Sequence, residues 1–205
     1  MSTKEDRIKY ADCMTFIRYR LEVINLFLNR KITTGYDIPD IETIALQFRK
    51  VFELIAMASL CSNREKFEEV RARFDKMWNA AEIIKMVEKF NPNFYPKPIE
   101  RKFNKDPSTG GTISPLLEGF LTKEELIKAI GRCGDLLHAD NPYSENEFIN
   151  EKWFNRFRDW NSKTHNLLKL HTIQVLNYDI QWWAVMKFGT NEPVQIAEMQ
   201  KITNG

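Results

Sequence analysis

Apolar side chains recur every three or four positions over most of this chain, and this spacing limits its fold more than any other feature of the sequence. Such a period places the apolar side chains on one face of an α-helix, where they can bury against other elements. Turn residues and prolines, such as Pro92, interrupt the pattern and divide it into separate helices. The pattern predicts helices near residues 4–30, 41–60, 77–90, 123–138 and 149–168, with the second in a central position.

The composition agrees with a mainly helical globular protein. Gly and Pro number only 8 each among 205 residues, fewer than turn-rich all-β proteins contain. Thirty Lys and Arg against 28 Asp and Glu leave a net charge of +2, which excludes a strongly basic protein that coats nucleic acid. No apolar run reaches the roughly 20 residues of a membrane span, and the charged start MSTKEDRIKY predicts a cytoplasmic protein. The three cysteines have no CxxC spacing, which argues against a zinc site and against a disulfide framework.

Residues 91–121 form a connection that is rich in proline and glycine and shows no sustained period. Connections of this length without regular structure are uncommon in compact domains unless they have a function. We predict an irregular loop with aromatic residues, or a lid. Lys97, Arg101 and Lys102 lie within it and form a local basic group that can meet phosphate, although a solvated surface is the alternative reading.

Two capping boxes and a change of period describe the rest of the chain. Thr122 with Glu125, and Ser144 with Glu147, have the spacing that satisfies free backbone N–H groups at a helix start. After the last helix the apolar period becomes two, which predicts strands over residues 180–188 and 194–202, with a third over residues 171–176. The predicted fold is therefore mainly α: a bundle of about five helices with a small C-terminal antiparallel β-hairpin or three-stranded meander.

The first candidate site lies on the helix 123–138. Arg132, Asp135 and His138 are successive i, i+3 neighbours, so a cation, a carboxylate and an imidazole form one polar row. His138 lies at the helix C-terminus, where the helix dipole and Asp135 both favour the protonated imidazole of a general acid. Cys133 falls on the buried stripe of this helix and is predicted to be a core thiol.

The second candidate pair lies on the helix 149–168. Arg158 and His165 are seven residues apart and nearly eclipsed, with Asn161 between them on the same side. The surrounding aromatic residues favour a packed core helix. For His171, in register with the apolar stripe, we predict a structural role.

A helical bundle with an Arg followed four to six residues later by a His resembles the HEPN superfamily, the higher-eukaryote and prokaryote nucleotide-binding domains. Arg132 matches this motif with His138, and Arg158 matches it with His165. The resemblance implies that residues 1–170 are a helical HEPN-like domain with 91–121 as its long loop. Residues 171–205 are then a β appendage packed on the same domain.

The resemblance also implies a function. Many HEPN proteins are metal-independent endoribonucleases of the prokaryotic toxin or antiviral defence type, in which two motifs meet across a homodimer. Carried over, the chain cleaves RNA by attack of the 2′-hydroxyl, needs no cofactor or metal, and has an antitoxin or a defence-system protein as a further partner.

The roles follow from that chemistry. Arg132 binds the scissile phosphate, His138 transfers protons, and Asp135 with Asn141 orients them. Lys97, Arg101 and Lys102 contribute to substrate binding. The competing interpretation is a non-catalytic helical module that binds a protein partner or RNA, with Arg132 and Asp135 as a surface ion pair and His138 as a helix cap.

Overall fold

The computed structural model describes residues 4–63, 80–103, 111–138, 150–176 and 179–200. Five helices lie within these residues: α1 (Lys4–Leu28), α2 (Asp37–Cys61), α4 (Ala80–Phe90), α5 (Lys123–Leu137) and α6 (Asn150–Leu168). The mainly helical fold class is confirmed. The predicted Ser144–Glu147 capping box lies outside the described residues. Helix α2 begins earlier than predicted because Asp37 and Asp40 favour its first turn and Pro39 is tolerated there.

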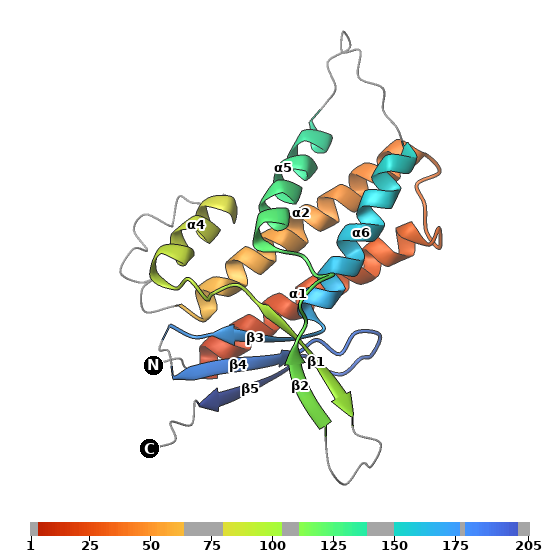
Figure 1. The fold of residues 1–205 in the computed structure, drawn as a ribbon. Helices are drawn as coiled ribbons and strands as arrows, with labels where there is room; N and C mark the ends of the chain where they lie inside the picture. Colours follow the sequence, from red (N-terminus) through yellow and green to blue (C-terminus); the bar gives the residue numbers. More distant parts are fainter. Residues whose placement is uncertain (1–3, 64–79, 104–110, 139–149, 177–178, 201–205) are drawn as a thin grey trace.

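Helix α2 is the centre of the bundle, as its apolar sequence predicts. It packs against α1, α4, α5 and α6, and Figure 1 shows it running diagonally between them. Phe48 and Phe52 are fully buried and stack on each other with their ring centroids 5.5 Å apart. Trp160 of α6 meets both rings edge-on, at 5.6 Å from each. An aromatic cluster therefore joins α2 to α6 and accounts for the aromatic sequence of the last helix.

The predicted capping box at the start of α5 is confirmed. The backbone N–H of Glu125 donates to the Thr122 hydroxyl oxygen at 3.2 Å, and the backbone N–H of Thr122 donates to a Glu125 carboxylate oxygen at 3.0 Å. This reciprocal pair satisfies two N–H groups that a helix start leaves free, and it defines where α5 begins.

The strands form one antiparallel sheet of five strands in the order β2-β1-β3-β4-β5. Its last three strands are the predicted C-terminal meander: β3 (Leu170–Gln174), β4 (Ile180–Val185) and β5 (Gln195–Gln200). In Figure 1 the sheet lies below the helices and beside the first half of α1. Trp182 of β4 is fully buried there and meets the ring of Tyr10 edge-on at 5.7 Å.

The connection 91–121 differs from the prediction, because it contains the other two strands. β1 (Lys97–Phe103) pairs with β3 through Lys97 and Pro98, and from Ile99 onward it pairs with β2 (Gly111–Pro115). The sequence KPIERKF lacks the alternating apolar pattern of a half-buried strand, so its strand state depends on pairing with β3 and β2. The sheet is thus not confined to residues 171–205, since a hairpin from between two helices extends it.

No helix among the described residues combines the length and the apolar character that crossing a bilayer requires.

Candidate functional site

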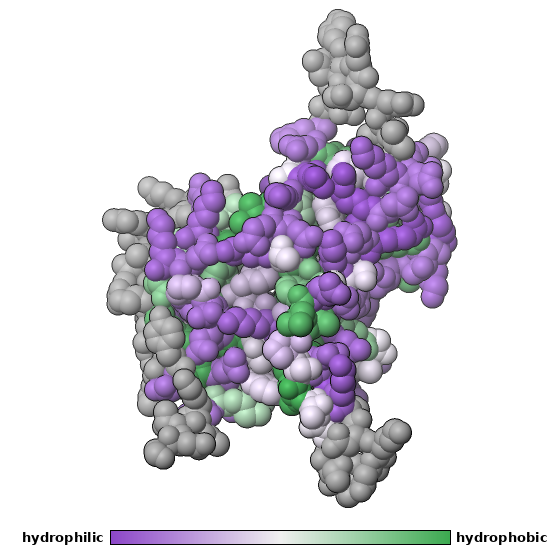
Figure 2. Space-filling model, in the orientation of Figure 1, coloured by the Kyte–Doolittle hydropathy of each residue, from purple (hydrophilic) through white to green (hydrophobic). Residues whose placement is uncertain are grey.

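A groove of about 230 Å³ lies between α5 and α6. It is lined by residues of both helices, most of them charged: Glu125, Lys128, Ala129, Arg132, Arg156, Asp159 and Trp160. Figure 2 shows that the face carrying α5 and α6 is predominantly hydrophilic. Arg132, the predicted phosphate ligand, is exposed on α5 and lines this groove.

Arg156 faces Arg132 from the other side of the groove. Its guanidinium lies over the ring of Trp153, with 4.8 Å between the guanidinium carbon and the ring centroid. Partial burial, and then the positive charge of Arg132, lower the pKa of Arg156. Lys128 lies one helical turn before Arg132, so the groove brings three cations together. We did not predict Arg156 or Lys128 as site residues. The sequence offered one signal for Lys128, its i, i+4 spacing from Arg132. It offered none for Arg156, which enters the groove because α5 and α6 both pack on α2.

The two carboxylates of the groove are bound by a different cation. Lys163 of α6 lies 2.8 Å from a Glu125 oxygen and 3.1 Å from an Asp159 oxygen. The hydrogen bond between Lys163 and Glu125 raises the pKa of the lysine and lowers the pKa of the glutamate. Among the described residues, Lys128, Arg132 and Arg156 therefore have no carboxylate partner.

Asp135 and His138 are exposed on α5, and neither lines the groove. The backbone N–H of His138 donates to the Asp135 carbonyl at 3.3 Å, so His138 is the C-cap residue of α5. Within the described part of the chain, no side-chain hydrogen bond or ion pair joins Arg132, Asp135 and His138 to one another. The polar row lies on one helix as predicted, but the structure brings Arg132 next to Arg156 and not next to His138. Asn141 lies outside the described residues.

Cys133 is fully buried on α5, which confirms its prediction as a core thiol, and burial raises its pKa to about 12. A thiol with such a pKa stays protonated near neutral pH and is a poor nucleophile.

The two residues of the second candidate pair contact different neighbours. Arg158 is exposed and donates a hydrogen bond to Asn155 at 3.3 Å. His165 is half-buried against Phe188, with the ring centroids 4.1 Å apart. Burial, and then the charge of Lys169, lower the pKa of His165, which disfavours the protonated form that a general acid needs. Asn161, placed between the pair by the sequence, instead donates to Asn25 of α1 at 2.8 Å. We therefore keep Arg132 and His138 as the first candidate site.

His171 has the predicted structural role, in β3. It is fully buried, and its Nδ1 and Nε2 atoms each lie 2.8 Å from an oxygen, of the Leu168 carbonyl and the Tyr10 hydroxyl respectively. Burial lowers the pKa of His171 to about 4, so the ring is neutral at pH 7. A neutral ring with Nδ1–H donating to Leu168 and Nε2 accepting from Tyr10 satisfies both contacts.

The predicted basic group of residues 97–102 is spread over β1. Lys97 donates to Asn93 at 2.9 Å, and Lys102 forms an ion pair with Glu100 at 3.1 Å. Neighbouring residues of a strand point to opposite faces, so Arg101 and Lys102 do not share one surface. In Figure 1 the β1–β2 hairpin extends downward and α5 upward, and none of these three residues lines the groove.

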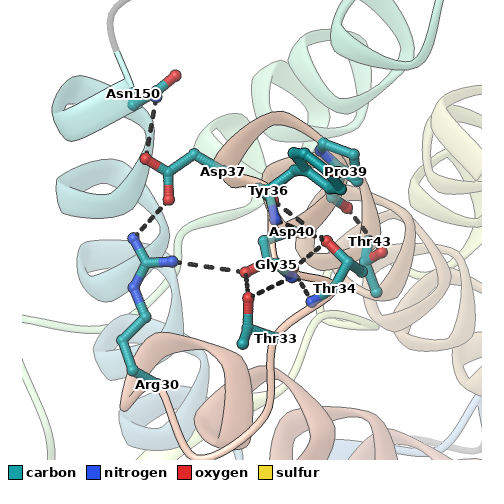
Figure 3. A network of polar contacts seen from close by, with 10 residues as sticks. All are labelled: Arg30, Thr33, Thr34, Gly35, Tyr36, Asp37, Pro39, Asp40, Thr43 and Asn150. Atoms are coloured by element: carbon teal, nitrogen blue, oxygen red, sulfur yellow. Dashed lines mark hydrogen bonds and ion pairs between the residues drawn. The ribbon is translucent and has the colours of Figure 1, made fainter.

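A compact polar network that the sequence did not reveal lies in the turn between α1 and α2 (Figure 3). The almost fully buried Asp40 accepts hydrogen bonds from the Thr33 hydroxyl at 2.6 Å and from the hydroxyl and N–H of Thr34, both at 2.7 Å. Arg30 binds Asp37 at 2.8 Å and approaches Asp40 at 3.4 Å. Burial alone would raise the pKa of Asp40, but these hydrogen bonds and the arginine outweigh it and lower the pKa. The network ties the turn to the start of α2 and has a structural role.

A second groove, of about 560 Å³, lies on the surface of α1 and α2. Its cations have partners: Arg49 and Lys50 bind Glu53 at 3.1 and 3.0 Å, and Arg20 donates to Gln47 at 2.8 Å. This pairing distinguishes it from the groove between α5 and α6.

Within the part of the chain that the structure describes, no group of three or more His, Cys, Asp or Glu side chains is arranged to hold a metal ion. In comparisons with known proteins, no family model, no curated protein and no solved structure matches this chain.

Proposed function

We propose that this chain is a HEPN-like, metal-independent endoribonuclease of the prokaryotic toxin or antiviral defence type that acts as a homodimer. Arg132 holds the scissile phosphate, and His138 of each subunit transfers protons. One imidazole removes the proton from the RNA 2′-hydroxyl, whose oxygen attacks phosphorus. The other protonates the departing 5′-oxygen, so the products are a 2′,3′-cyclic phosphate and a 5′-hydroxyl.

One observation carries this proposal: Arg132 is exposed in a groove where three cations have no carboxylate partner among the described residues. A guanidinium that is not neutralised by a protein carboxylate keeps its charge and its donors for a phosphate. His138 supports the proposal by its place, since it is exposed at the end of the same helix. The chemistry needs two such imidazoles at one phosphate, which is why the proposal includes a dimer.

The second candidate function is an RNA-binding module without cleavage. It is favoured by the lack of any side-chain contact, within the described residues, between Arg132 and either Asp135 or His138. In that case the groove binds the RNA backbone and His138 only ends the helix.

Incubation of the purified chain with RNA in EDTA tests the two functions. The nuclease is supported by products that end in 2′,3′-cyclic phosphate, provided that their formation is lost in His138→Ala and kept in His165→Ala. Loss in His165→Ala with retention in His138→Ala would move the site to Arg158 and His165. Intact RNA that binds to the wild-type chain favours the module. Light scattering adds a separate test, because a strict monomer contradicts the two-subunit mechanism.

A further inference from the structure

The three cations of the α5–α6 groove lie close together although their like charges repel one another. Lys128 and Arg132 are four residues apart on α5, and like charges at this spacing destabilise a helix. Packing of α6 then adds Arg156 to the same groove. The lowered pKa of Arg156, caused by burial and by Arg132, is consistent with this repulsion. A bound anion would relieve it.

The carboxylates next to these cations do not supply that anion. Glu125 and Asp159 both bind Lys163, at 2.8 and 3.1 Å, and this lysine outside the lining of the groove offsets one of their two negative charges. With Lys163 included, four cations stand against two carboxylates, so a net positive charge remains at the groove. In the groove on α1 and α2, by contrast, Glu53 binds two of the cations directly. The two grooves therefore differ in whether protein carboxylates already occupy the arginine and lysine donors.

The walls of the groove also suit a tetrahedral anion. The ring of Trp153 lies against the guanidinium of Arg156 and restricts its orientation. The small side chain of Ala129 and the buried Trp160 form the apolar part of the lining. Two guanidinium groups from different helices present forked N–H donors, and this geometry matches the oxygens of a phosphoryl group better than a single ammonium does.

We propose that Lys128, Arg132 and Arg156 form a binding site for a phosphoryl group, with the backbone of single-stranded RNA as its source. The inference rests on the proposed function for the choice of RNA, and it adds Arg156 and Lys128 to the substrate-binding residues. Arg156 and Lys128 bind and position the substrate, and they take no part in proton transfer.

Binding of a fluorescent 2′-O-methyl RNA oligonucleotide in EDTA tests the site, because this RNA has no free 2′-hydroxyl and cannot be cleaved by the proposed mechanism. We expect Arg132→Gln and Arg156→Gln each to weaken binding about tenfold and Lys128→Gln to weaken it less. The dependence of the affinity on salt should also become shallower in each variant. Lys85→Gln removes one charge from an exposed position on α4 and serves as the control, with unchanged binding expected.

Further arms separate the possible failures. Circular dichroism and a urea transition identify any variant that fails to fold, and Arg156→Lys, which keeps the charge but loses the fork, should bind with intermediate affinity. Calorimetry with inorganic pyrophosphate asks whether a free phosphate compound is the ligand. Pyrophosphate binding that depends on Arg156, without RNA binding, supports the phosphoryl-binding site. It would show that the ligand is a free phosphate compound and not the RNA backbone.

The outcomes for the site and for the nuclease are distinct. RNA binding that depends on Arg132 and Arg156, with no cleavage of ordinary RNA, supports the site and contradicts the nuclease. Cleavage that depends on His138 but is unchanged in folded Arg156→Gln and Lys128→Gln contradicts the site and supports the nuclease. A wild-type chain that binds neither RNA nor pyrophosphate overturns the inference.

Discussion

The α5–α6 groove and the interface between α1 and the sheet use polar side chains in opposite ways. At the interface, fully buried His171 has an oxygen within 2.8 Å of each ring nitrogen. Arg18, only 4% exposed, donates from one Nη atom to the carbonyl oxygen of Glu192 at 2.6 Å and approaches two further carbonyls. In the groove, Arg132 is exposed and, among the described residues, has no hydrogen-bond partner for its side chain.

The difference follows from the cost of burying polar groups. A buried donor or acceptor without a partner destabilises the fold. Protein oxygens lie within hydrogen-bond distance of both ring nitrogens of His171 and of one Nη atom of Arg18, although Nε of Arg18 has no partner among the described residues. An exposed cation is solvated by water, and the fold gains little by pairing it. The interface should therefore govern stability and the groove should govern binding, and the following substitutions separate the two.

The largest effect is expected at the interface. His171→Ala leaves the Tyr10 hydroxyl and the Leu168 carbonyl without their partner and opens a cavity, so the free energy of unfolding should fall by about 3–5 kcal/mol. Urea denaturation measures this change. Tyr10→Phe, which removes only the bond to Nε2, should cost about 1–2 kcal/mol. Wild-type stability in His171→Ala would show that the interface does not depend on this ring.

The same histidine makes stability depend on pH. The pKa of His171 is about 4 in the folded protein against 6.5 for an ordinary histidine, so the unfolded chain binds a proton more readily. The free energy of unfolding should thus decrease as pH falls from 6.5 towards 4, by up to about 3 kcal/mol.

Urea transitions at a series of pH values between 4.5 and 6.5 measure this dependence. His165, whose pKa is also lowered, adds a smaller change in the same direction. The slope should flatten in His171→Gln. An equal slope in that variant and in the wild type would assign the dependence to other groups.

The next effect belongs to the groove. The double substitution of Arg132 and Arg156 by Gln should weaken binding of 2′-O-methyl RNA about a hundredfold, since each arginine contributes roughly 1.4 kcal/mol, while the urea transition stays near that of the wild type. Fluorescence anisotropy measures the affinity for RNA, and urea denaturation measures the free energy of unfolding. If the free energy of unfolding of the double variant fell as much as its free energy of binding, the groove would govern stability as well as binding. The distinction between the two regions would then be wrong.

The smallest effects are expected at exposed charges outside both regions. Arg158→Gln and Lys50→Gln should each change the free energy of unfolding by less than about 0.5 kcal/mol and leave RNA binding unchanged. Among the described residues, the side chain of Arg158 makes a single hydrogen bond, to Asn155, and Lys50 has its own partner in Glu53. Weakened RNA binding in Lys50→Gln would indicate that the groove on α1 and α2, and not the α5–α6 groove, meets the RNA.

The elements differ in how far the sequence predicts them. The helices were predicted because each buries one apolar stripe, as α2 does through Phe48 and Phe52. The capping box of Thr122 was predicted because its partner lies three residues away. β1 was missed because it has no apolar face, and its strand state depends on pairing with β2 and with β3, which comes about 70 residues later in the chain.

The sequence by itself determined what depends on near neighbours: the helical periods, the C-terminal meander, the core position of Cys133, and the placement of Arg132 and His138 on one helix. Only the tertiary structure decided which side chains meet. The packing of α5 and α6 on α2 places Arg156 opposite Arg132, assigns Glu125 and Asp159 to Lys163, and leaves His138 outside the groove. The physical reason is that periodicity specifies the buried face of each helix, whereas the contacts between exposed faces follow from how the helices pack.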